Sequence, residues 1–83
     1  MKYWSKIKTE DRILRDLVRE DNDFPAALVS LCSHFDIGKP IICAKHISEM
    51  RAFRRTVFYP DDFVEQIDFD TLEIEIIDTR KNK

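Results

Sequence analysis

The sequence predicts a single α+β domain over residues 1–83, with an N-terminal hairpin and a C-terminal strand in one small, mostly antiparallel sheet and two helices packed on one face. Three observations lead to this prediction. One segment has apolar residues at helical spacing, and another alternates Leu and Ile with Glu, as strands do. The chain also has 43% hydrophobic residues and one glycine, the composition of a folding chain. So short a chain has a thin core, which favours self-association.

The N-terminal residues are the least clear segment. "KYWSKIKT" contains aromatic residues and favours a strand, and "TEDR" can form a turn. Helical spacing also fits the apolar residues Ile13, Leu14, Leu17 and Val18. We predict strands at 2–8 and 12–19, because a hairpin gives the C-terminal strand a sheet to join, and we leave a helix open for the second segment. Tyr3 and Trp4 are expected to cover one face of the hairpin, or to anchor a protein interface.

The clearest helix is predicted at residues 24–36. Asn22 or Asp23 can cap its first turn, where Pro25 also fits. Gly38 is expected to supply a left-handed stop. The apolar stripe of this helix comprises Phe24, Leu28, Leu31, Cys32 and Phe35.

A second helix is predicted at residues 45–55, with Ile47, Met50 and Phe53 on its apolar side and basic residues elsewhere. The following residues 56–59 favour extended structure, and "PDDF" can form one helical turn. The core residues that we predict are Leu28, Leu31, Phe35, Leu72, Ile74 and Ile76.

The C-terminal strand is predicted at residues 72–77. Its apolar residues alternate with Glu73 and Glu75, the pattern of a half-buried strand. The two carboxylates are expected to face solvent or the basic helix.

Charge is unevenly distributed along the chain. The net charge of −2 gives no overall sign of binding to nucleic acid or to a membrane surface. Residues 39–55 carry five basic residues and one acidic residue, whereas residues 56–79 carry eight carboxylates and no lysine or arginine. The simplest expectation is that the two blocks pair within the fold. The alternative is that they serve a partner.

Two cysteines and two histidines have the composition of a zinc site, but their spacing argues against one. Cys32 and His34 lie two residues apart on the predicted helix, so they point about 200° apart around its axis. Cys43 and His46 could act as a nucleophile and a base, but no third catalytic group is evident. We predict no metal, no cofactor and no catalytic residue. A small metal protein or enzyme using Cys43 and His46 is the third hypothesis.

The best candidate for a binding surface is the basic and aromatic side of the predicted helix 45–55. Its cations could contact phosphates, and an aromatic ring could stack on a base. The candidate binding residues are Lys45, His46, Arg51, Phe53, Arg54 and Arg55.

From Phe35 onward the chain contains "KH", an F-x-x-T-x-F spacing over residues 53–58, then "PDDF" and "FD-x-LEIE". This half of the chain resembles a family of small uncharacterised bacterial proteins. The resemblance favours the hairpin at the N-terminus. The family has no assigned activity, so the resemblance implies no functional residue.

The function that we predict is a small, non-enzymatic protein-interaction module, with a protein partner or a second copy of itself. The alternative is nucleic-acid binding through the helix 45–55. No apolar run approaches the roughly 18–20 residues that cross a bilayer. With two cysteines and no secretion signal, we expect a cytoplasmic protein with reduced thiols.

Overall fold

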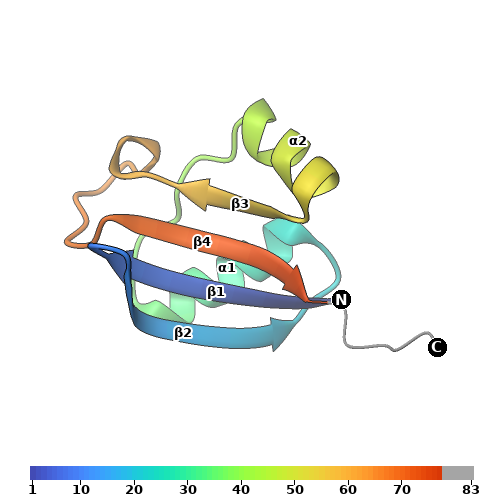
Figure 1. Ribbon diagram of the computed structural model, residues 1–83, viewed down its shortest axis with the longest axis horizontal. Coiled ribbons are helices and arrows are strands. Elements are labelled where there is room, and N and C mark those ends of the chain that lie inside the picture. The colour runs from blue at the N-terminus through green and yellow to red at the C-terminus, as the bar shows by residue number, and fades with distance from the viewer. Residues whose placement is uncertain (78–83) are drawn as a thin grey trace.

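The computed structural model describes residues 1–77, which form four strands, two α-helices and one 3₁₀ turn (Figure 1). In chain order these are β1 (Lys2–Thr9), β2 (Arg12–Glu20), α1 (Phe24–Phe35), α2 (Ala44–Phe53), β3 (Arg55–Phe58), the 3₁₀ turn (Pro60–Asp62) and β4 (Thr71–Ile77). The strands form one sheet in the order β2-β1-β4-β3, and all neighbours are antiparallel. The predicted α+β fold is confirmed, and the segment predicted as extended joins the sheet as β3.

The strands β1 and β2 form the predicted hairpin, which excludes the helix left open for the second segment. Their connection is the two-residue turn Glu10–Asp11, whose φ angles are 53° and 65°. Two successive positive φ angles are those of a type I′ turn, which matches the twist of the strands that it joins. The Asp70 carboxylate accepts a hydrogen bond from the Glu10 backbone N–H at 2.8 Å, which ties this turn to the start of β4.

Helix α1 begins and ends for local reasons that the sequence partly revealed. Asp23, rather than Asn22, caps it by accepting a hydrogen bond from a first-turn backbone N–H at 2.9 Å. The prediction that Gly38 supplies the left-handed stop is wrong, because Asp36 takes that conformation with a φ of 60°. Gly38 instead makes room for Glu65, since a Cβ there would lie 2.7 Å from the Glu65 Oε1.

Helix α2 is shorter than the predicted helix 45–55. Its first turn is held by His46, whose Nδ1 accepts a hydrogen bond from the Cys43 backbone N–H at 2.8 Å. Arg54 takes a left-handed φ of 60° and ends the helix, so Arg55 belongs to β3.

The predicted apolar stripe of α2 is wrong in two of its three members. The buried residues of α2 are His46 and Met50, one turn apart. Ile47 and Phe53 are 38% and 71% exposed. A step of three residues rotates about 60° back around a helix of 3.6 residues per turn, so a strict three-residue repeat drifts away from the contact face.

Both helices pack on the same face of the sheet. α1 lies across β1 and β2, and α2 lies beside β3 (Figure 1). Five predicted core residues are at most 3% exposed: Leu28, Leu31, Phe35, Leu72 and Ile74. The sixth, Ile76, is half-buried near the end of β4.

Within residues 1–77, no helix covers the opposite face of the sheet, which we call the open face (Figure 1). Consecutive residues of a strand point to opposite faces. Tyr3 is therefore 2% exposed among the helices, whereas Trp4 lies on the open face and donates a hydrogen bond to the Asp16 Oδ2 at 2.9 Å. The expectation that both aromatic residues cover one face of the hairpin is wrong for this reason.

Candidate functional site

The predicted binding residues separate into three groups in the structure. Lys45, Phe53 and Arg55 line a groove of about 310 Å³ between α2 and β3, which we call the α2–β3 groove. Arg51 and Arg54 are exposed near the end of α2 but do not line it. The remaining lining residues are Glu49, Thr56, Val57 and Tyr59. The sequence suggests Tyr59, like Phe53, as a ring on which a base could stack, but not the other three. Glu49 lies four residues from both Lys45 and Phe53, and this helical spacing could have revealed it. Thr56 and Val57 could not be found in this way, because they belong to the strand β3.

His46, the sixth candidate, is buried and does not belong to an exposed binding surface. Its exposure is 0%, and its ring stacks on Phe58 with a centroid distance of 4.2 Å. Because Nδ1 accepts the Cys43 backbone N–H, the proton of the neutral ring lies on Nε2. That nitrogen is 3.6 Å from the Asp62 Oδ2. His46 therefore holds the start of α2 against the sheet.

The α2–β3 groove combines aromatic rings with cations. Phe53 and Tyr59 are 71% and 52% exposed. The Lys45 Nζ lies 5.9 Å from the centre of the Tyr59 ring. The Glu49 carboxylate accepts a hydrogen bond from the Thr56 hydroxyl, which joins the two walls. The groove can therefore offer flat apolar surface and positive charge to one ligand.

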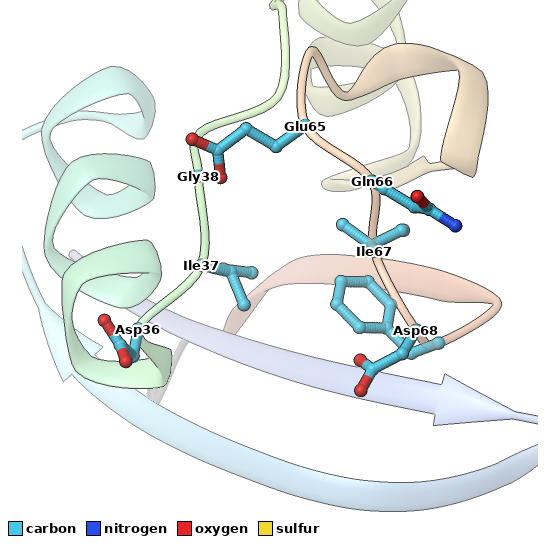
Figure 2. Close-up of a pocket in the computed structure, with 8 residues that line it drawn as sticks. Asp36, Ile37, Gly38, Glu65, Gln66, Ile67 and Asp68 are labelled. Atoms are coloured by element: carbon cyan, nitrogen blue, oxygen red, sulfur yellow. The ribbon is translucent and has the colours of Figure 1, made fainter.

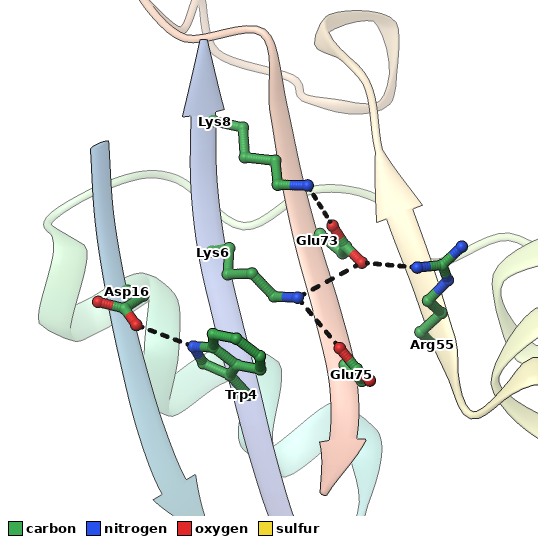
Figure 3. Close-up of polar contacts among 7 residues, drawn as sticks. All are labelled: Trp4, Lys6, Lys8, Asp16, Arg55, Glu73 and Glu75. Atoms are coloured by element: carbon green, nitrogen blue, oxygen red, sulfur yellow. Dashed lines mark hydrogen bonds and ion pairs between the residues drawn. The ribbon is translucent and has the colours of Figure 1, made fainter. Parts of the chain in front are cut away.

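The carboxylates of β4 pair mainly with strands, not with α2. Glu73 lies 3.0 Å from the Lys8 Nζ, 3.6 Å from the Lys6 Nζ and 3.3 Å from the Arg55 Nη1 (Figure 3). Glu75 lies 3.0 Å from the Lys6 Nζ. Burial raises the pKa of the Glu73 carboxyl, but the hydrogen bond from Lys8 and the charges of Lys6, Lys8 and Arg55 outweigh burial, so this pKa is lowered.

The expected pairing of the basic helix with the acidic strand therefore holds for Arg55 alone. Within residues 1–77, the cations Lys45, Arg51 and Arg54 make no ion pair with a carboxylate. Within that part of the chain, no carboxylate neutralises the positive charge of these three residues through an ion pair. The sequence did not predict the ion pairs of Lys6 and Lys8, because their carboxylate partners lie more than sixty positions further along the chain.

A second exposed surface is the outer edge of β2, which sequence reasoning also missed. Its apolar residues Ile13, Leu14 and Val18 are 49%, 56% and 49% exposed. Arg15 pairs with Ile7 and Ile13 with Lys8, so Leu14 is the extra residue of a β-bulge.

The backbone of β2 is also accessible at this edge. The Asp21 N–H donates to the Met1 carbonyl at 3.0 Å, so these two residues form a hydrogen-bonded pair. Hydrogen-bonded and non-hydrogen-bonded pairs alternate along an antiparallel ladder, so every second residue of β2 makes no backbone hydrogen bond to β1. Asp16, Val18 and Glu20 consequently direct their N–H and C=O groups away from β1. In the part of the chain that the structure describes, β2 has no strand on that side.

The residues considered for zinc or catalysis do not converge. Cys32 is buried, and burial raises the pKa of its thiol to about 11, whereas His34 and Cys43 are exposed. The His46 Nδ1 binds the Cys43 backbone, so it is not placed as a base for the Cys43 thiol. Within residues 1–77, no three His, Cys, Asp or Glu side chains are grouped to hold a metal ion.

A larger pocket of about 410 Å³ lies between the end of α1 and the segment that precedes β4 (Figure 2). Its wall carries the carboxylates of Asp36, Glu65 and Asp68, with Ile37 and Ile67 among them. The Glu65 side chain lies against Gly38 (Figure 2). The three carboxylates give the pocket negative charge, but within residues 1–77 they are not grouped closely enough to hold a metal ion.

No helix among residues 1–77 is both long enough and apolar enough to cross a membrane. Comparisons of this chain with protein-family models, with curated proteins and with solved structures found no match. The resemblance of its C-terminal half to a family of small bacterial proteins therefore stays a prediction.

Proposed function

We propose that this chain is a non-enzymatic protein-interaction module that binds its partner by adding a strand at the outer edge of β2. The observation that carries the proposal is the nine-residue strand β2, which within residues 1–77 has no strand on its outer side and exposes apolar side chains there. Such an edge is a template for strand addition, in which backbone hydrogen bonds give affinity and side chains give register.

The partner that we propose is a second copy of this chain. The edge carries both signs of charge, with Arg12, Arg15 and Arg19 beside Asp16 and Glu20. Two antiparallel copies can place opposite charges near each other, whereas a partner strand of a single sign would meet repulsion from part of the edge. Self-pairing would join two four-stranded sheets into one continuous sheet. It would also cover apolar area that a thin core leaves exposed.

The proposal is tested by measuring the molar mass of the native protein by light scattering across a wide concentration range. The wild type is expected to dimerise. Val18→Pro removes one outward N–H without removing a bond to β1, and it should yield a monomer, because edge strands tolerate proline on the solvent side. Val18→Lys should weaken the dimer as well.

The matched control is Val64→Lys, since Val64 is 79% exposed and lies outside the sheet. It should leave the dimer intact. Hydrogen exchange adds a positional signature: in the dimer the amides of Asp16, Val18 and Glu20 should become protected. A wild type that is monomeric at all concentrations contradicts the proposal, as does a dimer that Val18→Pro and Val18→Lys leave unchanged.

A further inference from the structure

The α2–β3 groove has a chemistry that the proposed dimer does not use. It lies on the β3 side of the sheet, at the edge opposite to β2. Lys45, Glu49 and Phe53 recur every four residues, so they form one side of α2, and residues from Arg55 to Tyr59 form the other wall.

The aromatic rings stand at opposite ends of the groove. Phe53 is the last residue of α2, whereas Tyr59 lies near Lys45 at the other end of the helix. Both rings are more than half exposed. Rings of this kind provide flat surfaces on which planar groups can stack.

Within residues 1–77, three of the four cations around the groove make no ion pair with a carboxylate. Lys45 lines it, and Arg51 and Arg54 follow along α2 without an ion pair to any carboxylate in residues 1–77. Arg55 contacts Glu73 but keeps 60% of its side chain exposed. Among the described residues that line the groove, Glu49 is the single carboxylate, and it accepts a hydrogen bond from Thr56. The groove is therefore complementary to an anionic ligand.

We propose that the α2–β3 groove binds single-stranded nucleic acid, with bases stacked on Phe53 and Tyr59 and phosphates beside Lys45 and Arg55. Single strands are bound by stacking platforms combined with basic residues along the backbone. An acidic peptide would satisfy the cations but would leave both rings without a flat partner. A duplex presents phosphates but hides the faces of its bases.

The test uses the full chain and a fluorescein-labelled oligothymidylate of about ten nucleotides, with fluorescence anisotropy as the readout. The wild type should bind at about 50 mM salt, and the logarithm of its affinity should fall linearly with the logarithm of the salt concentration. Phe53→Ala and Tyr59→Ala should each weaken binding about fivefold or more. Both rings are exposed, so these changes should leave the melting temperature nearly unchanged.

The contribution of charge is tested with two double variants that remove the same charge. Lys45→Gln with Arg55→Gln should lower the affinity and flatten the salt dependence. Lys2→Gln with Lys39→Gln, two positions that neither line the groove nor lie on β2, should change neither. Chemical-shift changes on adding the oligonucleotide should map to α2 and β3.

Three outcomes would overturn the inference. The first is no binding at low salt. The second is an equal loss in both double variants, which would indicate attraction by net charge without a site. The third is binding that both ring substitutions leave unchanged and that polyglutamate displaces, which would identify the groove as a site for acidic proteins.

Discussion

Replacing Glu73 by Gln should destabilise the fold, because Glu73 gathers three cations on the open face. The side chains of Glu73 and Lys6 are 6% and 8% exposed, so both groups have lost most of their contact with water. Gln keeps the shape of Glu but removes the negative charge. The Lys6 ammonium group would then remain buried beside a neutral amide.

The expected loss can be estimated from these contacts. Removing one partner of a buried ion pair costs about 3–5 kcal/mol. Lys6 keeps Glu75 at 3.0 Å, and Arg55 is 60% exposed and contributes little. We therefore expect a loss of about 2–3 kcal/mol, below the full range. This corresponds to a decrease in melting temperature of roughly 10–20 °C for a domain of this size.

The pH dependence of stability distinguishes the loss of the Glu73 charge from a general disruption of the fold. In the folded chain the pKa of Glu73 is lowered from 4.5, so the unfolded chain binds this proton more readily. The stabilisation is therefore present above pH 4.5 and is lost as the pH falls through the lower, folded-state pKa. The stability difference between wild type and Glu73→Gln should shrink over that interval.

Urea unfolding followed by circular dichroism, at neutral pH and below pH 4.5, measures both effects. Glu75→Gln is the matched control, because the Glu75 side chain is 37% exposed and, among residues 1–77, forms an ion pair with Lys6 only. It should cost about 1 kcal/mol or less. The reasoning is refuted if Glu73→Gln is as stable as Glu75→Gln at neutral pH, or if its difference from wild type does not depend on pH.

Two further predictions concern α1 and the thiols. Leu31→Ala should lower the free energy of unfolding by about 2–5 kcal/mol in thermal or urea denaturation, since Leu31 is fully buried; Val29→Ala, at a 50% exposed position of the same helix, should have little effect, and equal effects would show that the buried face is misassigned. Ellman's reagent should react rapidly with Cys43 in the native protein and with Cys32 only after unfolding, because burial raises the pKa of Cys32 to about 11 and shields its sulfur. Equal native reactivity of the two thiols would contradict this.

Much of the fold could be predicted, because its signals lie within single elements. The start of α1 follows from a capping Asp23 and a regular apolar stripe, and the period-2 alternation identifies β4 as a strand, although Glu73 is buried along with Leu72 and Ile74. The candidate site was harder to predict. The pattern of basic and aromatic residues correctly suggested that Lys45, Phe53 and Arg55 belong to one surface. His46 belongs to the same pattern in the sequence but is buried between α2 and β3.

The amino-acid sequence by itself determined that α1, α2 and β4 form and which sides of α1 and β4 are apolar, because these properties depend on residues within one or two turns of each other. That residues 12–20 form a strand and not a helix was decided by their pairing with β1. The tertiary structure alone decided that Lys6 and Lys8 reach Glu73, that β2 is an edge, and that Phe53 faces solvent. These features depend on strand order and on how α2 is oriented against β3. Both are contacts between segments far apart in the chain, on which the spacing of residues within a segment carries no information.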